Sequence, residues 1–315
     1  MKEINKLLPI LSILLAIICE KAIPNSILHP IAGKSYYTYF LIILLVIYII
    51  FYLFSFVIKK VRTQLEEKGP LYGAAILVLN IINLITVKFV LLPVLFFPSL
   101  DRVFGVFVED RELLVQCVLY SFKLLGTGFL FGAILGFATG VLIGFNKKAN
   151  YWITPITKVI GPIPATAWSP LVLSLFATSY QAAVFLVALA SWFPITLMTS
   201  SGIQNVKNSF FEAADTLGAN TPYKIFKVGV PAAMPQIFLG IFYATCGSFV
   251  TLVTAEMFGC KSGIGWYINW QKGLMLYPNV YAGLILLAGI CTIIISLLFK
   301  LKDKILVWQK GVIKW

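Results

Sequence analysis

Charged residues are scarce in this sequence. Only 12% of its 315 residues are Asp, Glu, Lys or Arg, whereas 60% are hydrophobic and the mean hydropathy is +0.93. A soluble domain carries about 25% charged residues. The shortage excludes an ordinary soluble protein. Because apolar stretches recur along the whole length, we predict an all-α protein that crosses a membrane several times.

Residues that bind metals or catalyse reactions are also few. The sequence has one histidine, His29, and five cysteines. Four of these fall in or at apolar segments, where small packing residues are expected. No carboxylate cluster and no Ser/His/Asp constellation in a loop is present. We therefore expect neither a metal site nor an enzyme.

A phosphate-binding loop is missing too. Gly33-Lys34-Ser35 matches the end of the pattern G-x-x-x-x-G-K-[ST], but Leu28 stands where the first glycine should be. No soluble α/β domain surrounds it. If this protein works with ATP, another chain is expected to bind it.

Long apolar runs are what the sequence does have. A bilayer core of ~30 Å needs about 20 helical residues. We predict spans at residues 36–58, 71–97, 117–145, 153–176, 182–203, 236–258 and 280–299. Residues 7–19 form a weaker candidate: a short span extended through Leu28, an interfacial helix or a signal sequence. A signal sequence is disfavoured because no small-x-small cleavage site follows directly.

Basic residues are distributed unevenly between these segments. With a cytosolic N-terminus and eight alternating segments, sixteen lie inside and six outside. The inner residues are Lys2, Lys6, Lys59, Lys60, Arg62, Lys68, Lys147, Lys148, Lys207, Lys224, Lys227, Lys300, Lys302, Lys304, Lys310 and Lys314. The outer ones are Lys21, Lys34, Arg102, Arg111, Lys261 and Lys272. This bias predicts cytosolic termini, and it explains the net charge of +13 without nucleic-acid binding.

The clearest internal break is Gly69-Pro70, after the charged run 59–68. It predicts an N-terminal extension over residues 1–68, with one or two membrane segments, and a six-span unit over 69–315. In the span at 117–145, glycine recurs at every fourth residue: Gly128, Gly132, Gly136, Gly140 and Gly144. Such a stripe favours close helix packing; a pore lining is the alternative.

Prolines interrupt the segment at 153–176. Gly161-Pro162-Ile163-Pro164 precedes Trp168 and Pro170, so a helix here should be kinked or broken. A broken helix at membrane depth needs protein or a watery cavity around it. The segment is either a packing kink or a wall of a transport path.

Four charged residues fall within or at the ends of apolar runs: Lys88, Lys123, Lys158 and Glu256. Charge at membrane depth is costly and indicates function. Snorkelling to the interface, or pairing, is the simpler interpretation.

The polar stretch 206–235 separates two spans on the basic side. Ser209 and Glu212 predict a capping box, and Gly218 a glycine C-cap. Thr221 as cap and Pro222 as first helical residue predict a second start. We expect two short helices, 209–217 and 222–228, the second ending before Pro231. Ala213 and Ala214 leave one face nearly bare. The hairpin is a structural cap or, since simple connections are shorter, a docking element.

Several motifs together resemble a known family. Glu212-Ala213-Ala214, Gly218 and Val228-Gly229-Val230-Pro231 are similar to the EAA loop of permease subunits of bacterial ATP-binding-cassette (ABC) importers; the usual ending I-x-L-P is here V-x-V-P. Phe97-Pro98-Ser99, Gly161-Pro162-Ile163-Pro164 with Trp168, and Ala255-Glu256-Met257 before Ser262-Gly263-Ile264-Gly265 resemble the nitrate/sulfonate/taurine branch of the binding-protein-dependent transport inner-membrane component family. The resemblance covers roughly residues 71–310.

The resemblance implies an importer subunit in the bacterial cytoplasmic membrane. It assigns Glu212, Ala213, Ala214, Asp215 and Gly218 to coupling with separate ATPase subunits, which would hold ATP and magnesium. It also implies a second permease chain, since the hairpin occurs once, and an extracytoplasmic solute-binding protein. Pro164, Trp168 and Glu256 lie in other family motifs and are residue types that are unfavourable in lipid. They are therefore weaker candidates for the translocation pathway.

The implied cargo is a small solute: a nitrate-, sulfonate- or taurine-like anion, or a vitamin precursor. Two other classes remain open from the residues alone. A secondary transporter would use buried charges for ion coupling, and a membrane scaffold would use the hairpin for docking without moving a solute.

Overall fold

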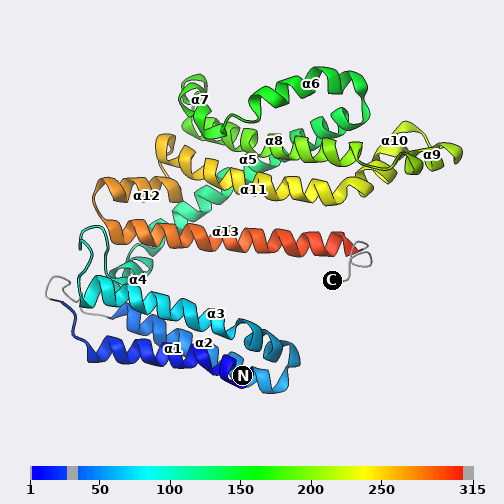
Figure 1. The fold of residues 1–315 in the computed structure, drawn as a ribbon. Helices are drawn as coiled ribbons and strands as arrows, with labels where there is room; N and C mark the ends of the chain where they lie inside the picture. Colours follow the sequence, from blue (N-terminus) through cyan, green and yellow to red (C-terminus); the bar gives the residue numbers. More distant parts are fainter. Residues whose placement is uncertain (1, 27–34, 308–315) are drawn as a thin grey trace. The chain divides into compact units, whose positions relative to one another are not determined.

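The computed structural model describes residues 2–26 and 35–307, and the regular structure of these ranges is entirely helical (Figure 1). Six helical segments are long and apolar enough to cross a membrane: Tyr36–Val57, Lys59–Lys88, Arg111–Phe145, Ser179–Gln204, Thr221–Gly259 and Tyr277–Ile305. The predicted all-α polytopic class is confirmed. His29 lies outside the described residues.

The helices follow one another in two compact units. The first comprises residues 1–112 and 271–282, and the second 113–270 and 283–315. The helices are α1 (Lys2–Ala22), α2 (Tyr36–Val57), α3 (Lys59–Asn83), α4 (Leu100–Glu109), α5 (Arg111–Phe145), α6 (Lys147–Ile160), α7 (Ser169–Leu175), α8 (Ser179–Gln204), α9 (Asn208–Thr216), α10 (Thr221–Tyr223), α11 (Val230–Gly259), α12 (Ile264–Gly273) and α13 (Tyr277–Ile305). Two π-helical segments, η1 (Leu84–Lys88) and η3 (Lys224–Gly229), and the 3-10 turn η2 (Ala165–Trp168) join some of them.

In the first unit α1 runs parallel to α3. A Cβ on Gly69 would collide with the carbonyl of Asn5, and one on Gly73 would lie 3.3 Å from the backbone of Leu8. Further along, Asn83 donates to Glu20 at 2.6 Å. Helix α1 therefore packs along most of α3, although it is not among the six segments that are long and apolar enough to cross a membrane.

The predicted break at Gly69-Pro70 is not a helix end, because α3 runs through it and contacts α1 there. The glycine permits close approach of the two helices. The division into an extension of residues 1–68 and a unit from residue 69 stays a prediction, and its boundary falls inside α3.

In the second unit, α5 packs against α8 through the glycine stripe. A Cβ on Gly128, Gly136, Gly140 or Gly144 would lie within 2.9 Å of an atom of α8, and one on Gly132 would collide with the side chain of Ser191. Thr139 and Thr196 add a hydroxyl–hydroxyl bond of 2.7 Å between the helices. The packing interpretation of the stripe is confirmed.

Helix α8 in turn lies beside α11 (Figure 1). A Cβ on Gly202 would lie 2.8 Å from Gln236, and one on Gly240 would lie 2.8 Å from Met198. Buried Leu124, Leu186 and Leu252 bring α5, α8 and α11 into one hydrophobic core.

The predicted span at residues 153–176 is not one continuous helix. Helix α6 ends at Ile160, η2 occupies Ala165–Trp168 and α7 begins at Ser169. Pro162 and Pro164 lie in the gap, where each lacks the amide that would continue a helix. The interruption itself was predicted correctly from these prolines.

Candidate functional site

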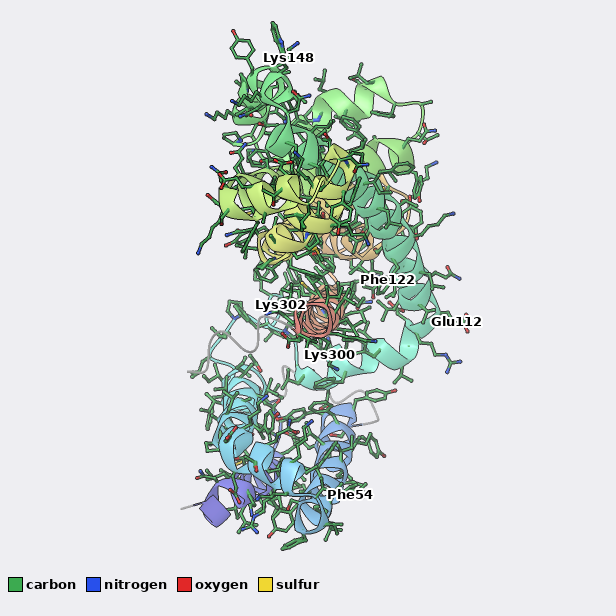
Figure 2. The ribbon with its side chains drawn as sticks, turned by 90° about the vertical axis from the view of Figure 1, so that its right-hand side faces the viewer. Phe54, Glu112, Phe122, Lys148, Lys300 and Lys302 are labelled. Atoms are coloured by element: carbon green, nitrogen blue, oxygen red, sulfur yellow. The ribbon has the colours of Figure 1, made fainter. Side chains whose placement is uncertain are left out.

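The polar stretch between α8 and α11 forms a hairpin over residues 207–229. In Figure 1, α9 and α10 extend past the end of α8, and the C-terminal end of α13 lies at that same end of the second unit. Figure 2 is seen from this end and labels Lys148, Lys300 and Lys302. The hairpin therefore lies at the end of the second unit that also carries Lys148, Lys300 and Lys302.

The two N-caps differ from those predicted. Helix α9 begins at Asn208 after Lys207, which makes no side-chain cap, so Ser209 is inside the helix and the capping box with Glu212 is wrong. The amide of Phe210 already donates to Lys207 O, so the first turn starts before Ser209 can cap it. At the start of the second helix, the Asn220 side chain rather than that of Thr221 accepts the hydrogen bond from the Tyr223 amide, at 3.0 Å.

The C-terminal cap of α9 is confirmed. Gly218 has φ +74°, and its amide donates to Asp215 O at 2.9 Å. The amide of Ala219 donates to Ala214 O at 3.0 Å. This pair of bonds is the Schellman motif, in which glycine is the residue that adopts positive φ without steric strain.

The second half of the hairpin does not end before Pro231. Residues Thr221–Gly259 form one continuous helical segment of 39 residues. The amide of Val230 donates to Ile225 O, five residues back, so η3 is a wide π turn. Pro231 directly follows this π turn inside the continuous segment, and the widened turn accommodates its ring and its missing amide.

Two contacts fix the hairpin's shape. The Lys224 ammonium lies 2.7 Å from Asp215, which joins η3 to α9. Phe211 packs edge-on against Phe145 at the end of α5, with ring centroids 5.8 Å apart. Sequence reasoning missed the ion pair, because its partners are nine positions apart, a separation that is not a helical spacing.

The outer face of the hairpin is exposed and apolar. Leu217 is 86% exposed, and Phe210, Tyr223 and Phe226 are more than half exposed. A hollow between the two halves is lined by Phe210, Ala213, Ala214, Leu217, Gly218, Ala219, Asn220, Tyr223 and Val228. The Glu212 side chain is exposed but is not among the residues that line this hollow. Such a surface is suited to a partner that supplies complementary apolar groups.

A second hollow lies at the break between α6 and α7. Pro164, Thr166, Phe193 and Thr251 are among its mostly apolar lining residues, which come from the broken segment, α8 and α11. Pro164 thus lines a hollow, as a path residue would. Trp168 lines no part of it; the indole is half-buried against the core of α7, α8 and α11.

Glu256 is fully buried in the last turns of α11. One carboxyl oxygen accepts from Ser121 at 2.6 Å and the other from the Gly265 amide at 2.8 Å. The neighbouring thiol, Cys260, is buried just beyond α11, and this burial raises its pKa.

The three lysines of the apolar runs differ in setting. Lys88 is buried, lies 3.2 Å from Glu20 and donates to the carbonyl of Ile23 at 2.7 Å. Lys123 and Lys158 are exposed, and Lys123 lies over the ring of Tyr180. Pairing is therefore confirmed for Lys88. Its partner Glu20 carried no spacing signal, since 68 residues separate the two.

Together these features define a polytopic helical membrane protein with one exposed hairpin between two long spans. Residues 128–307 match the model of the family described as "Binding-protein-dependent transport system inner membrane component". The match covers more than half of the chain, and the chain belongs to this family.

Known relatives and structures agree with this membership. The chain is 31% identical over 216 residues to the bicarbonate transport system permease protein CmpB of Synechococcus elongatus, covering 68% of this chain and 73% of that protein. It is 31% identical to the nitrate import permease protein NrtB of Leptolyngbya laminosa, over 52% of this chain and 61% of the other. The inward-facing MetNI methionine ABC transporter shares the fold, with a TM-score of 0.52 and 22% identity over 65% of this chain and 99% of that chain.

Membership in this family decides between an importer subunit and the two other classes of protein that the sequence left open, a secondary transporter and a membrane scaffold. The protein is a multi-pass inner-membrane permease subunit of an ATP-driven, binding-protein-dependent importer, not an ion-gradient-driven transporter. It is a transport subunit without enzymatic activity of its own, and the ATPase is a separate subunit. Its partners therefore include an ATPase and a solute-binding protein.

Proposed function

We propose that the hairpin of residues 207–229 docks on the ATPase subunit and couples ATP hydrolysis to transport. The observation that carries the proposal is its exposed apolar face, held on a fixed support. Leu217, Phe210 and Tyr223 stand out around the hollow. The Schellman turn at Gly218 and the Asp215–Lys224 pair keep the two halves in place.

Within this proposal the five predicted coupling residues have distinct tasks. Ala213 and Ala214 leave room for a partner side chain in the hollow, because they offer little more than backbone. Glu212 is exposed and available to a basic or polar group of the partner. Asp215 and Gly218 act on the shape of the hairpin rather than by contact.

The test compares Gly218→Val and Glu212→Ala in the assembled importer. Gly218→Val should cost about 1 kcal/mol or more in the cap, because valine resists positive φ, and should uncouple transport from ATP hydrolysis. Unchanged ATP-driven uptake in both variants would refute the assignment. Thr216→Ala, which removes a bond only within α9, is the matched control.

The wider assembly follows from a single hairpin per chain. We propose that two copies of this permease pair, each contacting one ATPase subunit that carries ATP and magnesium. The hairpin end of the second unit is proposed to face the cytosol, since it also carries Lys148, Lys300 and Lys302. Both termini are proposed to be cytosolic from the distribution of basic residues along the sequence alone. Mass measurement of the purified complex should find two permease chains and two ATPase chains; one permease chain would contradict the pairing.

The solute is proposed to be a small anion. Two relatives are named for bicarbonate and nitrate, which share a small size and negative charge. Competition for ATP-driven uptake among nitrate, bicarbonate and taurine tests this. Absence of competition by any of the three, with a vitamin precursor competing, would redirect the proposal.

A further inference from the structure

A single helical segment links the hairpin to the opposite end of the second unit. Thr221–Gly259 contains 39 residues, or roughly 58 Å at 1.5 Å per residue, which exceeds the ~30 Å bilayer core. Lys224, near its start, pairs with Asp215 of α9. Glu256 lies one turn before its end. A displacement of the hairpin is thus applied directly to the helix that carries Glu256.

At the far end, Glu256 joins three elements. The Ser121 hydroxyl on α5 donates to one carboxyl oxygen at 2.6 Å, and the Gly265 amide of α12 donates to the other at 2.8 Å. Ser121 also accepts the Ile264 amide at 2.9 Å. These four residues, here called the Glu256 clamp, fasten the end of α11 to both α5 and the start of α12.

The turn before α12 is shaped around this carboxyl group. Gly263 has φ +118°, and a Cβ there would collide with the Glu256 carboxyl carbon. A Cβ on Gly265 would lie 3.0 Å from the Glu256 Cβ. The sequence Ser262-Gly263-Ile264-Gly265 therefore lets the backbone come close enough for the Ile264 and Gly265 amides to donate their hydrogen bonds.

We propose that Glu256 is a positioning residue that fastens the end of Thr221–Gly259 to α5 and α12, so that hairpin movement is transmitted to the opposite membrane face. This inference rests on the coupling role proposed for the hairpin. A role as a charged path residue fits the geometry less well. Glu256 is 0% exposed, both its oxygens accept protein hydrogen bonds, and it does not line the hollow beside Pro164.

Cys260 provides a native reporter for the clamp. It follows α11 directly and is only 8% exposed, and the raised thiol pKa keeps its alkylation slow while the clamp is closed. The experiment uses the full chain, with the other four cysteines replaced by serine, assembled with its ATPase subunits in lipid nanodiscs. N-ethylmaleimide alkylation of Cys260 is timed without nucleotide and after trapping with MgATP and vanadate, and ATP hydrolysis is measured in parallel.

Transmission predicts that trapping changes the Cys260 alkylation rate at least threefold in the parent protein. Glu256→Ala should speed alkylation in both states and abolish the difference, with ATP hydrolysis within twofold of the parent. Glu256→Gln should keep the difference, because its amide oxygen can accept from Gly265 and its amide nitrogen can donate to Ser121. Thr254→Ala, which loses only a bond within α11, is the matched control.

Three results would overturn the inference: no nucleotide effect in the parent protein, a preserved effect in Glu256→Ala, or a loss in Glu256→Gln as complete as in Glu256→Ala. The last would indicate that charge, not hydrogen bonding, is needed. Failure of the hairpin proposal looks different. In that case the permease would not assemble with the ATPase, or Gly218→Val would leave coupled uptake intact.

Discussion

The two units of this chain share close packing at glycines but differ in the polar contacts between their helices. In the first, ion pairs join α1 to α3 and to η1: Lys6 with the partly exposed Glu66 at 3.1 Å, and buried Lys88 with Glu20 at 3.2 Å. In the second, glycines of α5 bring its backbone against α8. Because the hydrophobic effect does not drive helices together within lipid, polar contacts or close packing must hold them together. The family match begins at Gly128. Close approach at glycines occurs in both units, at Gly69 in the first and along α5 in the second, whereas the buried ion pair of Lys88 with Glu20 lies in the part of the chain before the match.

The largest expected effect comes from breaking a buried pair in the first unit. Lys88→Met should destabilise it by about 3–5 kcal/mol, because Glu20 is then buried without its cation. Thermal unfolding of the purified protein, followed by fluorescence, measures the loss. Lys123→Met, at an exposed lysine, is the control. An equal change in both variants would show that the pair has no structural role. Adding Glu20→Gln to Lys88→Met should recover part of the stability, because the unpaired buried charge is then removed.

A smaller effect is expected from breaking the glycine contact in the second unit. Gly132→Ala should cost about 1–3 kcal/mol, since the new methyl group meets Ser191 and the backbone of Ala188. Gly126→Ala, on the same helix with nothing within 4 Å, should be neutral or stabilising. The same unfolding measurement separates them, and similar results for both would show that α5 does not need its glycine face.

The smallest effect should follow from a hydroxyl between the same helices. Thr196→Val removes the bonds to Thr139 and to Gly136 O and should cost about 0.6 kcal/mol, the usual value for such bonds between membrane helices. Thr292→Val, which loses only a bond within α13, is the control. A loss comparable to that of Gly132→Ala would mean that polar contacts, not backbone approach, dominate the second unit.

The features that could be predicted are those carried by local sequence. Apolar run length marked six of the seven predicted spans, the run at 153–176 being the exception. Gly218 marked the end of α9, and the prolines marked the interruption after Ile160. The stripe of five glycines predicted a packing face on α5, although the sequence did not reveal that α8 is the helix it packs against.

The features that were missed depend on contacts distant in sequence or on competition between neighbours. Glu20 and Lys88 are 68 residues apart, and Ser121 and Glu256 are 135 apart, so no spacing joins them. At the hairpin, Asn220 and Thr221 can both cap, and the sequence does not reveal which side chain reaches the amide of Tyr223. The helix was expected to stop before Pro231 because a π turn that admits the proline has no sequence signature.

Contact between the hairpin and the ATPase tests the central claim most directly. Ala213→Cys places a thiol in the hairpin hollow and Gly126→Cys places one on α5, in a background without other cysteines. Both variants carry a photoreactive cross-linker and are irradiated in the assembled importer. The account predicts that the ATPase subunit is cross-linked from position 213 and not from position 126. An ATPase that purifies with the permease but is never captured from position 213 would contradict it.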